Sequence, residues 1–98
     1  MTEPKIKIRI DESVKEPSKA KVIYLNDDKT PMDFVVDSLI KYFKHDDDAA
    51  YNLTMDVHEK GSAVVAVLPY EIAETKGVAV TSDARSQGYP LVVKIQQD

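Results

Sequence analysis

The chain of 98 residues contains no cysteine and few glycines. The lack of cysteine excludes disulfides, thiolate metal sites and a cysteine nucleophile, and it fits a reducing compartment. No apolar run approaches the roughly 18 residues of a membrane-spanning helix. The N-terminus also lacks the apolar segment of a signal peptide. From these absences we expect neither a membrane protein nor an exported one.

Positive charge is scarce as well, because 13 Lys and Arg residues face 17 Asp and Glu residues and leave a net charge of −4. Nucleic-acid-binding domains usually carry a basic surface, so this balance argues against that class. The two histidines are not spaced as a metal-binding pair. No glycine-rich phosphate loop and no nucleophile–base pattern occurs. The sequence therefore predicts no enzymatic activity, no cofactor and no metal site.

The length suits one domain. Residues 1–19 are predicted to form a flexible N-terminal extension and residues 20–98 the core domain. Within the extension, residues 5–10 read Lys-Ile-Lys-Ile-Arg-Ile and alternate with a period of two. That period is typical of a strand, but the segment has no evident partner in the sequence. We therefore expect it to be flexible unless another part of the fold offers it one.

The remaining pattern predicts the order β-α-α-β-α-β. Strands are expected at residues 21–25, 62–68 and 90–95, and helices at about 31–44, 46–60 and 69–87. Thr30 is expected to cap the first helix, with Pro31 at its first position, and Gly61 to end the second. Gly77 inside the third helix should cost about 1 kcal/mol relative to alanine. This order predicts an α+β fold, a small three-stranded antiparallel sheet packed against three helices.

The junction between the first strand and the first helix is the most informative segment. Asn26, Asp27 and Asp28 crowd the few residues between two apolar stretches. Oxygen acceptors beside apolar side chains suit a small ligand with a cationic end and an apolar end. Asn26 and Asp27 could equally be only turn-forming residues.

Several short motifs occur in an order that resembles one family, the ClpS adaptors of bacteria and organelles. They are Leu25-Asn26-Asp27-Asp28, Thr30-Pro31-Met32, Phe34-Val35, Val57-His58, residues 70–76, Ala84-Arg85 and Pro90-Leu91. The resemblance implies a non-enzymatic adaptor. Such an adaptor binds N-degrons, which are substrates with a free α-amino group and a large apolar first residue. It delivers them to a ClpA-type AAA+ unfoldase that works with the ClpP protease.

The resemblance also implies roles for single residues. Asn26, Asp27 and His58 would hold the α-amino group. Asp28 would shape the loop or attract the ligand from a distance. The pocket for the first side chain would comprise Asp28, Thr30, Met32, Val35, Thr54, Val57 and Leu91. The unfoldase would contact Glu71, Thr75 and Lys76.

Two features depart from the family pattern. Family members most often carry a methionine where this chain has Thr54, and the smaller residue predicts better tolerance of Ile or Val as first residue. The N-terminal extension is also short, so delivery could differ even where binding is normal. We expect a monomer in the bacterial cytoplasm, with a ClpA-type or ClpC-type unfoldase as partner. The alternative is a docking module of the same fold, like the C-terminal domain of the ribosomal stalk protein, without N-degron binding.

Overall fold

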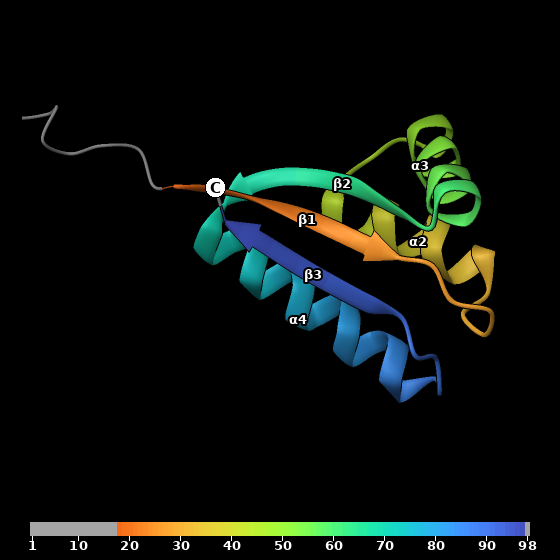
Figure 1. Cartoon of the computed structure of the whole chain (residues 1–98). Helices are drawn as coiled ribbons and strands as arrows, with labels where there is room; N and C mark the ends of the chain where they lie inside the picture. The colour runs from red at the N-terminus through yellow and green to blue at the C-terminus, as the bar shows by residue number, and fades with distance from the viewer. Residues whose placement is uncertain (1–17, 98) are drawn as a thin grey trace, which may run out of the picture.

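The computed structural model describes residues 18–97. Its elements follow the predicted order (Figure 1): β1 (Lys19–Leu25), α2 (Met32–Phe43), α3 (Asp47–Lys60), β2 (Ser62–Pro69), α4 (Tyr70–Ser86) and β3 (Val92–Gln97). The predicted α+β class is therefore confirmed. Residues 1–17, which hold most of the predicted extension, lie outside the described part, and β1 begins one residue before the predicted start of the core domain. Within residues 18–97 no helix is long and apolar enough to cross a membrane.

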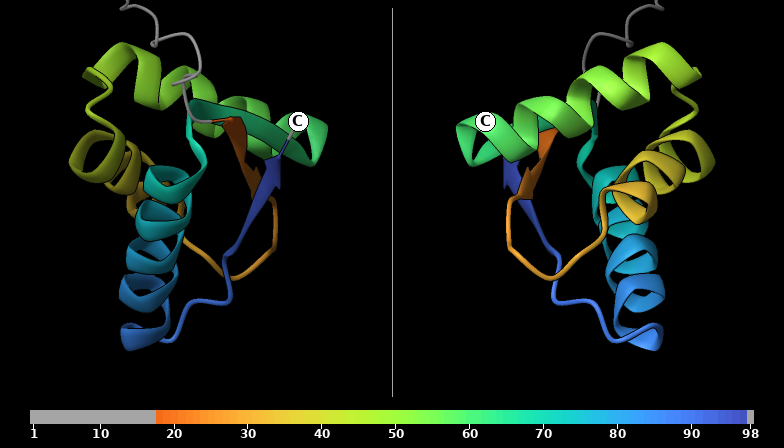
Figure 2. Two further views of the ribbon diagram at one scale, coloured as in Figure 1. Left: turned by 90° about the vertical axis from the view of Figure 1, so that its left-hand side faces the viewer. Right: turned by 90° about the vertical axis from the view of Figure 1, so that its right-hand side faces the viewer.

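The three strands form one antiparallel sheet in the order β2-β1-β3. Side chains alternate across a strand, and Ala20, Val22 and Tyr24 of β1 are fully buried on one face. Figure 2 shows α4 along that side of the sheet with α2 beside it, whereas within residues 18–97 no helix covers the opposite face. Val64 and Val67 are exposed, as expected for the uncovered face. The sheet thus has one buried face and one open face.

Tyr24 anchors the core between the sheet and α2. Its hydroxyl group lies 2.8 Å from that of Ser38, and the Ser38 hydroxyl also donates to the carbonyl of Val35 at 2.8 Å. The ring meets Phe43 edge-on, with the centroids 6.2 Å apart. Burial raises the pKa of Tyr24 strongly above its usual 10.0, although the hydrogen bond with Ser38 opposes the shift. A polar pair is therefore accommodated in the core because both hydroxyl groups find partners.

The start of α2 differs from the sequence prediction. Thr30 was expected to be the N-cap, but Pro31 occupies that position and no side chain caps the helix. The reason is that the Thr30 hydroxyl donates to the carboxylate of Asp27 instead, so it does not act as an acceptor for the first turn. For α3, Asp46 is the cap and accepts from the N–H of Ala49 at 2.8 Å, which confirms the predicted start. Gly61 ends α3 with a φ of 90°, as predicted.

Gly77 lies where α4 packs on β3. A Cβ atom there would stand 3.1 Å from Cδ1 of Ile95 and 3.7 Å from Cγ1 of Val93. The sequence predicted only that Gly77 lowers helix propensity. The structure shows that it also permits a close approach of helix and strand. The helix begins at Tyr70, because Pro69 is the last residue of β2 rather than the opening residue of the helix.

Candidate functional site

The turn between β1 and α2 is built around the carboxylate of Asp27. Its Oδ1 accepts hydrogen bonds from the backbone N–H groups of Lys29 at 2.8 Å and Thr30 at 2.7 Å. Its Oδ2 accepts from the Thr30 hydroxyl at 2.8 Å. An aspartate that bonds the backbone two and three residues later stabilises a tight turn. A carboxylate offers about four acceptor positions, so roughly one remains for a ligand.

The charge of Asp27 is stabilised by its surroundings. Desolvation raises the pKa of Asp27, but the hydrogen bonds from Thr30 and Lys29 and the charge of Arg85 together outweigh this effect. The pKa of Asp27 is therefore below its usual 3.8. The side chain is ionised at neutral pH and places a negative charge at the end of β1.

Beside this turn the structure brings together nine of the ten residues predicted to bind an N-degron, together with Leu25. They line one small hollow that encloses about 20 Å³: Leu25, Asn26, Asp27, Thr30, Met32, Val35, Thr54, Val57, His58 and Leu91. Asp28 is exposed and does not line it. The prediction missed Leu25 as a lining residue, although it directly precedes the polar segment.

The hollow has an apolar floor and a polar rim. Val35, Val57 and Leu91 are at most 6% exposed, whereas Asn26 and His58 are exposed. These residues come from the end of β1, from α2, from α3 and from the segment before β3. The backbone N–H of Asn26 donates to the carbonyl of Gly61 at 2.9 Å, which fixes the end of β1 against the end of α3. The arrangement can hold a cationic group at its edge and an apolar group inside.

Thr54 is buried at the hollow and only 2% exposed. Its hydroxyl donates to the carbonyl of Ala50 at 2.8 Å, which is one turn earlier in α3. The donor is therefore already engaged, and the Thr54 hydroxyl can offer a ligand only its acceptor lone pairs. An apolar side chain in the hollow gains no hydrogen bond there.

Arg85 positions the segment that carries Leu91. Its guanidinium group donates to the carbonyl of Tyr89 at 2.8 Å and to that of Leu91 at 2.9 Å. A planar guanidinium can hold two acceptors at once, so one side chain fixes the chain after α4. The sequence motif contained Arg85, but nothing in the sequence identified this role.

The residues predicted to contact the unfoldase do not all lie on one surface. Glu71 and Thr75 are exposed on one side of α4, and the Thr75 hydroxyl donates to the Glu71 carbonyl at 2.9 Å. The ammonium group of Lys76 instead donates to the carbonyl of Tyr42 at 2.8 Å. Lys76 thus joins α4 to the end of α2 and is only partly exposed.

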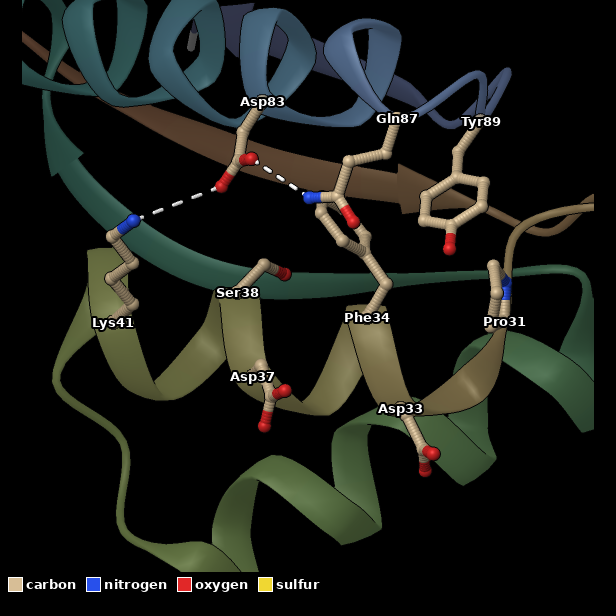
Figure 3. Close-up of a pocket in the computed structure, with 9 residues that line it drawn as sticks. All are labelled: Pro31, Asp33, Phe34, Asp37, Ser38, Lys41, Asp83, Gln87 and Tyr89. Atoms are coloured by element: carbon tan, nitrogen blue, oxygen red, sulfur yellow. Dashed lines mark hydrogen bonds and ion pairs between the residues drawn. The ribbon is translucent and has the colours of Figure 1, made fainter.

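A larger cleft of about 500 Å³ separates α2 from the second half of α4. Figure 3 shows Asp83, Gln87 and Tyr89 directed toward α2, and Asp33 and Asp37 directed away from α4. The hydrogen bonds from Tyr42 and Gln87, and then the charge of Lys41, hold the pKa of Asp83 below its usual value. Since the carboxylates diverge, the cleft does not form a cation site. Within residues 18–97, no group of three His, Cys, Asp or Glu side chains could hold a metal ion.

Comparison with known proteins identifies the family to which the sequence is similar. Residues 15–94 match the family model described as ATP-dependent Clp protease adaptor protein ClpS. The ATP-dependent Clp protease adapter protein ClpS of Sodalis glossinidius (strain morsitans) is 42% identical over 89 residues, which are 91% of this chain and 84% of that protein. The protein of the same name from Cronobacter sakazakii is 43% identical over 86 residues, which are 88% of this chain and 81% of that protein.

A solved structure agrees as well. The structure of Agrobacterium tumefaciens ClpS2 bound to L-phenylalaninamide matches with a TM-score of 0.81 and 37% identity. The match covers 85% of this chain and all of the other. The predicted family resemblance and fold are thereby confirmed. This chain belongs to the ClpS family of ATP-dependent Clp protease adaptor proteins.

Proposed function

We propose that this protein is a non-enzymatic adaptor that binds N-degron substrates and delivers them to a ClpA-type unfoldase for degradation by ClpP. The observation that carries the proposal is the small hollow, where a polar rim adjoins an apolar floor. The related ClpS2 was solved with L-phenylalaninamide, which joins a free α-amino group to a large apolar side chain. The two chemical halves of that ligand correspond to the two halves of this hollow.

The rim would recognise the α-ammonium group. Asn26 offers an amide oxygen, Asp27 a carboxylate, and His58 a ring nitrogen that accepts when neutral. Hydrogen bonds between an ammonium and a carboxylate are about twice as strong as neutral ones. An acetylated amine has lost its charge and two of its three donors, so these acceptors would be left without partners.

The floor would bind the first side chain. Val35, Val57 and Leu91 are buried and would contact an apolar group, which gains about 25 cal/mol per Å² removed from water. The hollow encloses only about 20 Å³, so a leucine or phenylalanine side chain requires more room. Met32 lines it and is 38% exposed. Its flexible thioether side chain is the group best able to move aside.

Fluorescence anisotropy of labelled peptides that differ only at residue one tests the proposal. Peptides starting with Leu, Phe, Tyr or Trp should bind with micromolar or better affinity, and N-acetyl-Leu should not. Replacing Asn26 by alanine removes a hydrogen bond to a charged group, worth about 1.5–3 kcal/mol, or about 10- to 150-fold in affinity. The matched control is Asn52→Ala, since Asn52 is exposed on α3 and does not line the hollow. If no peptide with a free amine binds, the proposal is wrong.

Delivery would use the exposed surface of α4 that carries Glu71 and Thr75. Charges at the edge of an interface mainly change association rates, so Glu71→Lys should slow unfoldase binding and leave peptide binding intact. Glu59→Lys on α3 is the matched control, because Glu59 is also exposed. The two variants are compared by the rate at which a ClpAP-type protease degrades a substrate that begins with leucine. Equal rates would contradict this surface. Lys76 would contribute mainly by fixing α4 on α2.

The remaining details follow from the same proposal. The protein would act in the bacterial cytoplasm as a monomer, without catalysing a reaction of its own. The relatives with which it was compared come from bacteria, which supports this location. The alternative of a stalk-like docking module has no specific observation in its favour.

A further inference from the structure

The segment between α4 and β3 forms one wall of the small hollow. We call residues 87–91 the wall segment. Its last residue, Leu91, is 1% exposed and lines the hollow. Nearer its start, Gln87 and Tyr89 line the larger cleft between α2 and α4 instead. The wall segment thus has a hollow beside each of its ends, so its position depends on the contacts that hold it.

Backbone hydrogen bonds hold the start of the wall segment. The N–H of Gly88 donates to the carbonyl of Arg85 at 3.0 Å. The N–H of Tyr89 donates to the carbonyl of Ala84 at 2.9 Å. This pair of bonds is the Schellman motif that ends many helices, and Gly88 has the positive φ that it requires, 83°. The motif fixes the chain only as far as Tyr89, whose ring also meets Phe34 of α2 edge-on with the centroids 5.3 Å apart (Figure 3).

The side chain of Arg85 holds the rest of the wall segment. Its Nη1 donates to the carbonyls of Tyr89 at 2.8 Å and Leu91 at 2.9 Å. Pro90 lies between these two residues and has no N–H group of its own to donate. Arg85 is exposed, so its replacement removes no buried side chain from the core. The guanidinium group is therefore a direct tie between the backbone of Leu91 and the end of α4.

A fixed Leu91 limits the room for a first side chain. The hollow encloses only about 20 Å³, so a large side chain enters only when a lining group moves. Met32 is 38% exposed and has a flexible side chain, whereas the backbone of Leu91 is held by Arg85. A side chain that fits once Met32 has moved leaves the wall in place. A larger one must also displace Leu91 and works against the hydrogen bonds of Arg85, since a wall that is fixed in advance favours the ligands that fit it.

Arg85 also acts on the rim through its charge. The charge of Arg85 contributes to holding the pKa of Asp27 below its usual value. This effect concerns the α-ammonium group, which every peptide with a free amine carries. It therefore cancels when the affinities of two peptides that differ only in their first side chain are compared.

We propose that Arg85 is a positioning residue that limits the size of the first side chain the hollow accepts, because its hydrogen bonds to the carbonyls of Tyr89 and Leu91 keep the Leu91 wall in place. The inference rests on the proposed function, since it concerns the side chain of a bound N-degron. It assigns size selection to a residue outside the hollow.

Arg85→Lys tests the proposal, because it keeps the positive charge but replaces the planar guanidinium by a single ammonium group. Fluorescence anisotropy of the full chain compares labelled peptides that start with Leu and with Trp. The ratio of the Trp affinity to the Leu affinity should rise about tenfold in the variant, the effect of about one methylene group in an apolar pocket. The NMR order parameters of the Leu91 methyl groups, measured without peptide, should fall. Arg85→Gln should raise the affinity ratio as well.

Val80→Ala is the control for a general loss of stability. Val80 is a fully buried residue of α4 that does not line the hollow, so this variant weakens the core and should leave the ratio unchanged. An unchanged ratio in Arg85→Lys, an equal rise in Val80→Ala, or unchanged Leu91 order parameters overturns the proposal. If the natural chain binds no peptide with a free amine, the proposed function is wrong and this inference falls with it. Peptide binding by the natural chain thus separates the two failures.

Discussion

Replacing Thr54 by methionine should make the pocket more selective against β-branched first residues. Thr54 lines the hollow and is 2% exposed, so a longer side chain must extend into the hollow or displace its neighbours. A difference of one methylene in an apolar pocket changes discrimination by about 1–3 kcal/mol, or about 10- to 200-fold. Methionine adds about that much bulk over threonine. We therefore expect peptides starting with Ile or Val to lose at least about tenfold in affinity relative to a peptide starting with Leu.

The matched control is Thr54→Val, which preserves the shape and removes only the hydroxyl group. Because that hydroxyl donates to the carbonyl of Ala50 within α3, its removal should not change how an apolar first side chain binds. The ratio of the affinities for Ile and Leu peptides should therefore stay the same. Anisotropy titrations with Leu, Phe, Ile and Val peptides give the ratios directly. Overpacking can cost about 1–3 kcal/mol of stability, so urea unfolding of each variant must confirm that it is folded under the assay conditions. An unchanged Ile to Leu ratio in Thr54→Met would refute the reasoning.

Three further predictions concern stability. Gly77→Ala should leave the free energy of unfolding nearly unchanged, because a gain of about 1 kcal/mol in helix propensity is offset by the 3.1 Å approach of the new Cβ to Cδ1 of Ile95. In an Ile95→Val background, which lacks that Cδ1 atom, the same substitution should stabilise the protein. If urea unfolding shows the same effect of Gly77→Ala in both backgrounds, the explanation is wrong. Tyr24→Phe should cost about 1 kcal/mol at pH 7. The raised pKa of Tyr24 adds stability below pH 10 that is lost as the pH rises above it, so the variant should lose less stability on going from pH 9 to pH 11; parallel losses in both proteins would count against the assignment. The lowered pKa of Asp27 adds stability that is present above about pH 4 and lost as the pH falls below it. Asp27→Asn should therefore make the free energy of unfolding depend less steeply on pH below about pH 4. An unchanged pH dependence in this variant would contradict the assignment to Asp27.

Much of this fold could be predicted because its signals are local. The periodic apolar stripes, the acidic start of α3 and the glycine at its end each act within one turn of helix. The residues of the small hollow were predicted through the family resemblance, since no local pattern brings Val35, Thr54 and Leu91 to one place. Their proximity depends on how α2, α3 and the segment before β3 pack on each other, which a single sequence does not show.

Two features that the sequence did not reveal have a common physical cause, which is contact between groups that are distant in sequence. Lys76 was predicted to contact the unfoldase, and the sequence did not reveal that its ammonium group donates to the carbonyl of Tyr42 at the end of α2. Gly77 was counted as a loss of helix propensity, because its closeness to Ile95 of β3 lies outside the helix itself. In each case a tertiary contact adds a role that the local sequence does not reveal.

At the site itself Asp27 shows a competition between neighbouring residues, and this competition decides how mutational results there should be interpreted. The junction was expected to combine the oxygen acceptors of Asn26, Asp27 and Asp28 with a helix capped by Thr30. In the structure the carboxylate of Asp27 accepts hydrogen bonds from the Thr30 hydroxyl and from two backbone N–H groups. The helix α2 therefore starts without a side-chain cap. The same carboxylate therefore shapes the turn and supplies the charge of the rim, so a change at Asp27 alters both the geometry and the electrostatics of the hollow. Asn26 contributes to the fold through its backbone N–H, which any residue except proline provides. Its side chain makes no hydrogen bond to any of residues 18–97, so Asn26→Ala separates binding from folding where Asp27→Asn does not.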